Sequence, residues 1–131
     1  MKFIVESIQD GLITLKTPNA NYCNTFKFVG TSPQIGTRIV GEVYADARKA
    51  ESVSLGGNYV EPLFGRPRRM QGMVLNHQPS NNALRVLVGY EVTVKLPDDQ
   101  SPAQFPIGSH VGWDNADWPE FMIQSPAGVA V

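Results

Sequence analysis

Apolar and polar residues alternate over several short segments of this chain, which is the pattern of half-buried β-strands. The first two segments flank Asp10-Gly11, a pair that favours a tight hairpin turn because both residues tolerate positive φ. Prolines and glycines separate the other segments, and the chain contains ten prolines and twelve glycines. Residues 46–52 could form a single helical turn. The expected strands are residues 2–8, 12–16, 25–29, 38–46 and 53–55 in the first half and residues 70–75, 84–88, 92–96, 111–113 and 121–123 in the second.

The strands and turns follow the same order in both halves. A turn proline and an Ile-Gly pair precede the fourth strand of each half, at Ile35-Gly36 and at Ile107-Gly108. Five short antiparallel strands in about 60 residues match the size of one small barrel. The shared order has two possible explanations. The chain contains an internal repeat, or the two stretches are similar by chance because both need a turn before a strand.

The predicted fold class is all-β. The chain forms either two similar five-stranded antiparallel barrels, close to the oligonucleotide/oligosaccharide-binding type, or one merged barrel or sandwich built from both halves. The expected domains are residues 1–60 and 61–125, followed by a frayed tail at 126–131.

Composition narrows the class of protein further. The apolar fraction is 42%, the charged fraction is 18% and the formal net charge is −1, which indicates a globular chain with no surplus of positive charge for nucleic acid. The one cysteine, Cys23, cannot form an internal disulfide. The apolar run at the start of the chain is interrupted at Glu6 and is too short for a signal peptide or a membrane span. A cytoplasmic protein with no membrane partner is expected.

The stretch from Ile35 to Leu55 is similar to the end of TOBE domains, small barrels found in molybdate- and tungstate-binding proteins and in transporter ATPases. The closing segment of those domains typically has a Gly, then Val-Ala after a few residues, and then a Lys-Ala-x-x-Val-x-Leu run. The matching residues here are Val43, Ala45, Lys49, Ala50, Val53 and Leu55. The resemblance implies a small barrel and an oxyanion ligand. The Ser-Ala-Arg-Asn stretch of the family's oxyanion pocket has no counterpart here, and Arg-Pro-Arg-Arg stands in its place before Met70.

The densest basic cluster of the sequence comprises Arg66, Arg68 and Arg69, at the expected junction between the halves. Guanidinium groups bind phosphate and other oxyanions with two hydrogen bonds. Trp113 and Trp118 flank an acidic turn and could provide an aromatic platform for a ligand. These five residues form the candidate ligand site. Both groups also have a purely structural interpretation. The arginines could be solvated residues of a linker, and the tryptophan rings could cover the end of a barrel.

A catalytic or metal-binding role has little support in the sequence. His77 and His110 are far apart, and neither they nor Cys23 have the spacing of a zinc site or of an activated nucleophile. No cofactor is expected. The sequence therefore favours a non-enzymatic binding module for a small anion, nucleotide or oligosaccharide at the junction. The alternatives are an interaction module that self-associates into a homo-oligomer through strand edges, and a single-stranded nucleic-acid binder.

Overall fold

The protein is an all-β chain, as the alternation predicts. The computed structural model describes the backbone of residues 2–54 and 56–129, and the side chains of these residues as far as Gln124. Two short 3₁₀ turns, η1 (Pro79–Asn81) and η2 (Pro102–Gln104), are the helical elements of this part of the chain. The strands are β1 (Lys2–Gln9), β2 (Leu12–Lys16), β3 (Cys23–Phe28), β4 (Arg38–Val53), β5 (Tyr59–Glu61), β6 (Phe64–Gly65), β7 (Arg69–Gln78), β8 (Ala83–Leu87), β9 (Glu91–Lys95), β10 (His110–Asn115) and β11 (Glu120–Val129).

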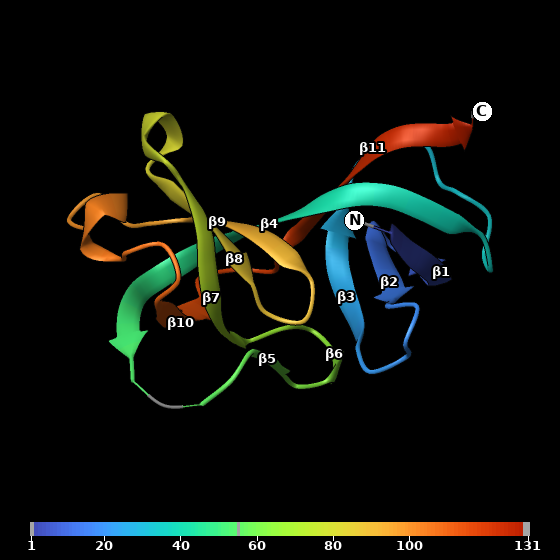
Figure 1. Cartoon of the computed structure of the whole chain (residues 1–131). Helices are drawn as coiled ribbons and strands as arrows, with labels where there is room; N and C mark the ends of the chain where they lie inside the picture. Colours follow the sequence, from blue (N-terminus) through green and yellow to red (C-terminus); the bar gives the residue numbers. More distant parts are fainter. Residues whose placement is uncertain (1, 55, 130–131) are drawn as a thin grey trace.

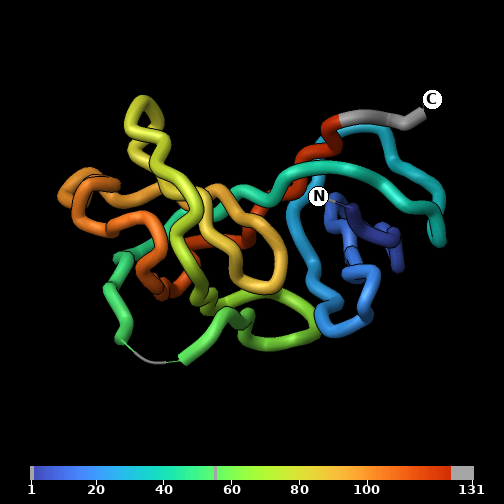
Figure 2. Tube along the Cα trace, viewed as in Figure 1, coloured from blue at the N-terminus to red at the C-terminus, as the bar shows by residue number. Residues whose placement is uncertain are grey.

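The strands close into two five-stranded rings that share β4 (Figure 1). The first ring follows the order β1, β2, β3, β11 and β4, and the pairing of β4 with β1 closes it. The second ring follows the order β4, β10, β7, β8 and β9, and the pairing of β9 with β4 closes it. Strand β4 crosses from one ring to the other, and β5 and β6 lie in the segment that connects the rings (Figures 1 and 2).

The fifth strand of each ring comes from the other half of the chain. β11 belongs to the second half, yet it pairs with β3 and with β4 in the first ring. The end of β4 belongs to the first half, yet it pairs with β9 and β10 in the second ring. Of the two predicted alternatives, the merged arrangement of both halves therefore describes the strand pairing. The domain boundary between residues 60 and 61 stays a prediction.

The sheet is mixed, which the antiparallel prediction did not include. β3 pairs in parallel with β11, and β9 pairs in parallel with β4. A closed ring with an odd number of strands cannot alternate direction at every pairing, so each five-stranded ring needs one parallel pair of this kind. The short strand β6 is also parallel to β3.

One local prediction is wrong. The helical turn at residues 46–52 does not form, because β4 continues through them and pairs with β10 from Ala47 to Val53. The backbone of β11 is assigned as far as Val129, and the frayed tail at 126–131 stays a prediction. Residues 130 and 131, together with Leu55 of the predicted short strand, lie outside the described residues.

The two Ile-Gly turns make corresponding hydrogen bonds. Gly36 N donates to Val5 O over 2.7 Å, and Gly108 N donates to Val74 O over 2.8 Å. Both glycines have positive φ, at 87° and 89°. Because L-residues with side chains rarely adopt this conformation, the glycines account for the repeated motif. Each turn starts the strand that lies beside the first strand of its own half.

Aromatic side chains fill the first ring. The centroid of Phe3 lies 5.5 Å from that of Tyr90 and 5.6 Å from that of Phe121. The second ring contains the fully buried Trp113, together with Met70 and aliphatic side chains. Leu84, Val86 and Val94 are among these aliphatic side chains, and all three are fully buried. The two interiors belong to one hydrophobic cluster, so the rings pack as a single body.

Candidate inter-ring binding groove

The predicted arginine cluster is divided between two places. Arg66 stacks on Trp118, with its Cζ 4.7 Å from the centroid of the indole ring. Arg68 and Arg69 instead line a shallow pocket beside β5, together with Tyr59 and Leu63. The pair formed by Arg66 and Trp118 was predicted to share a site, and the structure brings it together. The complete set of three arginines does not converge on one point.

Arg69 is already engaged by protein groups. Its Nη1 lies 3.4 Å from Asp114 Oδ1, and a hydrogen bond with Tyr59 is the main cause that raises the pKa of the guanidinium, with Asp114 adding to it. The same side chain lies over Gly112, where an added Cβ would come within 2.9 Å of Nη2. Arg68 is exposed, and its backbone N–H donates to Glu61 O over 2.8 Å.

Trp113 belongs to the core of the second ring. Its side chain is 0% exposed, and Nε1 donates to Asn115 Oδ1 over 2.7 Å. Asn115 Nδ2 in turn donates to Pro67 O over 3.0 Å. A side chain buried in this way presents no surface to a ligand, so the predicted platform at Trp113 is not supported. Its position on β10, where alternate residues face inward, explains the burial.

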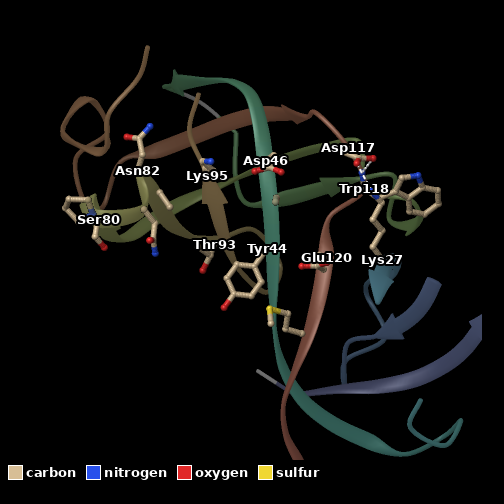
Figure 3. A pocket seen from close by; sticks show the side chains of 15 residues that line it. Lys27, Tyr44, Asp46, Ser80, Asn82, Thr93, Lys95, Asp117, Trp118 and Glu120 are labelled. Atoms are coloured by element: carbon tan, nitrogen blue, oxygen red, sulfur yellow. Dashed lines mark hydrogen bonds and ion pairs between the residues drawn. The ribbon is translucent and has the colours of Figure 1, made fainter. Parts of the chain in front are cut away.

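An open groove with a volume of about 750 Å³ lies between the rings, where β9, β4, β11 and β3 run side by side (Figure 3). We call it the inter-ring groove. Most of its lining side chains are polar or charged, and two carry aromatic rings. The lining residues are Lys27, Tyr44, Ala45, Asp46, Pro79, Ser80, Asn81, Asn82, Ala83, Thr93, Lys95, Asp117, Trp118, Glu120 and Met122.

One ion pair lies at the first-ring side of the groove. Lys27 Nζ is 2.6 Å from Asp117 Oδ2, and Trp118 N donates to the other oxygen of the same carboxylate over 2.7 Å. The hydrogen bond from Lys27 is the main cause that lowers the pKa of Asp117. These contacts set the position of the loop that carries Trp118, and the dashed lines in Figure 3 mark them.

Three further charged side chains of the groove remain unpaired. Within the described residues, Asp46, Lys95 and Glu120 make no side-chain hydrogen bond and no ion pair. Asp46 and Lys95 are exposed, and Glu120 is half-buried. Their hydrogen-bonding capacity is therefore open to a ligand or to water.

Tyr44 is held by a charged network beside the groove. Its Oη donates to Glu42 Oε2 over 2.5 Å, and this hydrogen bond is the main cause that raises the pKa of the phenol. Arg85 Nη1 reaches the other Glu42 oxygen at 3.3 Å, and Arg85 Nη2 lies 2.5 Å from Glu91 Oε1. The network joins β4 to the hairpin of β8 and β9, so it fixes the tyrosine ring in the groove wall.

The candidate site predicted from the sequence shares only Trp118 with the groove and does not include Lys27, Tyr44, Asp46, Lys95 or Glu120. A signal was present, because Lys27 and Lys95 are the polar members of alternating strands whose neighbours are buried. Alternation shows that such residues face outward. It does not show that β9 and β3 flank the same groove, since neither strand pairs with the other.

The described residues contain no group of three or more His, Cys, Asp or Glu side chains placed to hold a metal ion. Cys23 is half-buried, and burial is the main cause that raises the pKa of its thiol. Among residues 2–54 and 56–129, no helix has the length and the apolar character needed to cross a membrane. In comparisons with family models, with curated proteins and with solved structures, nothing matches this chain.

Proposed function

We propose that this protein is a non-enzymatic binding module whose ligand occupies the inter-ring groove. The observation that carries the proposal is that three charged side chains, Asp46, Lys95 and Glu120, have no partner among the described residues and lie with two aromatic rings in one groove. Concave sites with a few convergent polar groups are the usual places where proteins bind small molecules. The candidate ligands are a small anion, a nucleotide and an oligosaccharide.

The charges of the groove bear on the choice among these classes. The groove is lined by two lysines, Lys27 and Lys95, and by three carboxylates, which are Asp46, Asp117 and Glu120. An anion entering the groove would therefore meet at least as much repulsion as attraction. The arginine pocket beside β5 is the second place where an anion or a nucleotide phosphate would bind, because the Arg68 guanidinium there has no partner in the described part of the chain.

The two closed rings support a wider proposal about the fold. Five strands per ring agree with a barrel of the oligonucleotide/oligosaccharide-binding type, which is also what the resemblance to TOBE domains implies. We propose that the rings are an internal repeat, because the two Ile-Gly turns make matching hydrogen bonds. A cytoplasmic location belongs to the same proposal, with the single cysteine in its favour.

A thermal-shift screen with sulfate, molybdate, nucleotides and neutral oligosaccharides tests this function. At least one class should raise the melting temperature, because a ligand that binds only the folded state stabilises it by mass action. The double variant Asp46→Ala/Glu120→Ala should lose the shift, and Arg68→Ala/Arg69→Ala should keep it. The opposite result would move the site to the arginine pocket, and the absence of any shift would contradict the binding function.

An interaction module is the second candidate, and exposed apolar side chains favour it. Leu63 is 49% exposed and Phe64 is 63% exposed, in the segment that connects the rings. Adjacent exposed apolar residues of this size often mark a contact with another protein. Light scattering separates the candidates, because a stable oligomer without a ligand response would favour self-association. Binding of single-stranded nucleic acid would require a steep dependence of affinity on salt.

A further inference from the structure

The inter-ring groove contains the same kinds of side chain twice. On the first-ring side, Lys27 of β3 is the register partner of Glu120 of β11 in a parallel pairing. On the second-ring side, Lys95 of β9 is the register partner of Asp46 of β4, also in a parallel pairing. Each side of the groove thus has one lysine next to one carboxylate.

Two aromatic rings accompany these pairs, and both line the groove. Tyr44 lies between the two pairs, because it precedes Asp46 by two residues on β4 and is the register partner of Glu120 on β11. Trp118 precedes Glu120 by two residues, lies at the edge of the groove beside Lys27 (Figure 3) and carries Arg66 on its ring. We call each lysine with its carboxylate a set.

The two sets are related by an approximate two-fold axis between β4 and β11. These central strands are antiparallel, with Glu120 opposite Tyr44. Further along β4, Ala116 N donates to Asp46 O over 2.8 Å. The segment that precedes β11 therefore also runs beside β4. In Figure 3, Lys95 and Asp46 lie on one side of the groove centre, and Glu120 and Lys27 lie on the other in the reverse order.

The chemistry of each set suits a hydroxyl-rich ligand. A carboxylate accepts hydrogen bonds from hydroxyl groups, and an ammonium group donates to hydroxyl oxygens. An aromatic face packs against apolar surface while its edge stays hydrated. Because the lysines and carboxylates of the groove nearly balance, a neutral ligand loses nothing to repulsion, whereas an anion does. The volume of about 750 Å³ falls within the usual range for small-molecule sites, roughly 300–1,000 Å³.

We propose, on the basis of the function proposed above, that the inter-ring groove has two like subsites and binds a neutral oligosaccharide of at least two units. One unit lies against Asp46 and Lys95, and another lies against Glu120 and Lys27, with Tyr44 between the two units and Trp118 at the edge of the groove. Linking two units in one ligand makes the second contact intramolecular, so affinity rises with chain length.

The two subsites differ in two respects. The turn from Pro79 to Asn82 walls the groove beside Lys95. This turn connects β7 to β8. The corresponding turn of the first ring, at Asp10-Gly11 between β1 and β2, is shorter and does not line the groove. Lys27 is also occupied by Asp117, whereas Lys95 is free of such a partner in the described residues. The subsite at Asp46 is therefore the stronger of the two.

Isothermal titration with neutral glycans of one, two and four units tests this proposal, using glucose, mannose, galactose, xylose and N-acetylglucosamine series. At least one series should bind more tightly as it lengthens from one to four units. For the longer ligands, Asp46→Ala and Glu120→Ala should each lower affinity about tenfold, the effect of losing one hydrogen bond to a charged group. For single units, Asp46→Ala should have the larger effect. Glu51→Ala, which removes an exposed carboxylate of β4 outside the groove, is the matched control.

The outcomes separate this inference from the function on which it rests. If single units bind as tightly as longer chains, or if only one carboxylate affects the longer ligands, the two-subsite arrangement is wrong. If no glycan binds but a nucleotide or an anion binds in a way that depends on Asp46 and Glu120, the inference fails and the binding function stands. If none of these ligands binds, both fail. Unchanged melting temperatures of the variants without ligand show that the substitutions leave the fold intact.

Discussion

At the scale of single residues, Tyr90 connects the two rings. It follows β8 in the second ring, but its side chain is 1% exposed and lies among the aromatic residues of the first. Its Oη donates to Asn24 Oδ1 over 2.8 Å. Asn24 Nδ2 in turn lies 3.1 Å from Gly65 O and 3.2 Å from Pro62 O. One buried phenol therefore joins a hairpin of the second ring, a strand of the first and the connecting segment.

Replacing Tyr90 with Phe should lower the free energy of unfolding by about 1–3 kcal/mol, because it leaves the buried Asn24 Oδ1 without a donor. Urea unfolding at pH 7 measures the loss. Tyr22→Phe is the matched control, since Tyr22 packs its ring 6.0 Å from Tyr90 and no hydrogen bond of its hydroxyl occurs in the described residues. An equal loss in both variants would contradict this role of the Tyr90 hydroxyl.

The same residue predicts a dependence of stability on alkaline pH. Burial raises the pKa of Tyr90 well above its ordinary value of 10.0. Above pH 10 the unfolded chain releases the phenolic proton and the folded chain keeps it, so the wild type should lose stability as the pH rises. Tyr90→Phe should lack this part of the loss. Urea unfolding between pH 8 and 10.5 compares the two proteins, and parallel curves would contradict the assignment.

At the scale of elements, β4 determines how the rings fit together. One edge of the strand pairs first with β1 and then with β9. The other edge pairs first with β11 and then with β10. Gly41 lies where β11 crosses, and an added Cβ would come within 2.3 Å of both Met122 O and Phe121 Cζ. A side chain at this position is therefore incompatible with the pairing of β4 and β11.

Gly41→Ala should destabilise the protein by about 1–3 kcal/mol or more, since overpacking forces side chains or backbone to shift. The matched control is Gly57→Ala, because Gly57 is exposed and an added Cβ there meets nothing within 4 Å. Thermal unfolding followed by circular dichroism compares the two. If both variants melt at the wild-type temperature, the close approach of β11 to β4 is wrong.

Individual elements were largely predictable from the sequence. The hairpin at Asp10-Gly11 forms as expected, between β1 and β2. Phe26 and Phe28 alternate with Lys27 and are buried, as the period of a strand requires. The prediction failed at β4, where Asp46 to Ser52 looked like a break. Only the neighbouring strands β9 and β10 make an extended conformation favourable there, and they lie far away in the sequence.

At the scale of the whole molecule, the exchanged fifth strands make the halves depend on each other. The first ring needs β11, and the second needs the end of β4. A five-stranded ring that lacks one strand exposes both its core and two unpaired edges. The rings are therefore expected to fold together rather than in succession.

Separating the chain between Gly56 and Gly57 tests this dependence. Residues 1–56 and 57–131, expressed apart, should each show weak tertiary structure by near-ultraviolet circular dichroism and no cooperative melting. Mixed in equal amounts, they should recover a cooperative transition, because the cut lies in an exposed connection and leaves every pairing partner available. Cooperative melting of either half as a monomer would contradict the exchange.

The sequence by itself determined much of the local structure: where most of the strands lie, where Gly and Pro end them, and which side chains alternate between the two faces. These properties follow from alternation and from backbone sterics, which act between neighbouring residues. It also placed Arg66 and Trp118 in one candidate site, and the two side chains are in contact in the structure. Only the tertiary structure decided that β11 and β4 exchange between the rings, that Trp113 is buried, that the three arginines separate, and that Lys27 and Lys95 face one groove. Alternation determines the face on which a side chain lies, whereas the choice of a strand's partner depends on packing between residues distant in the sequence.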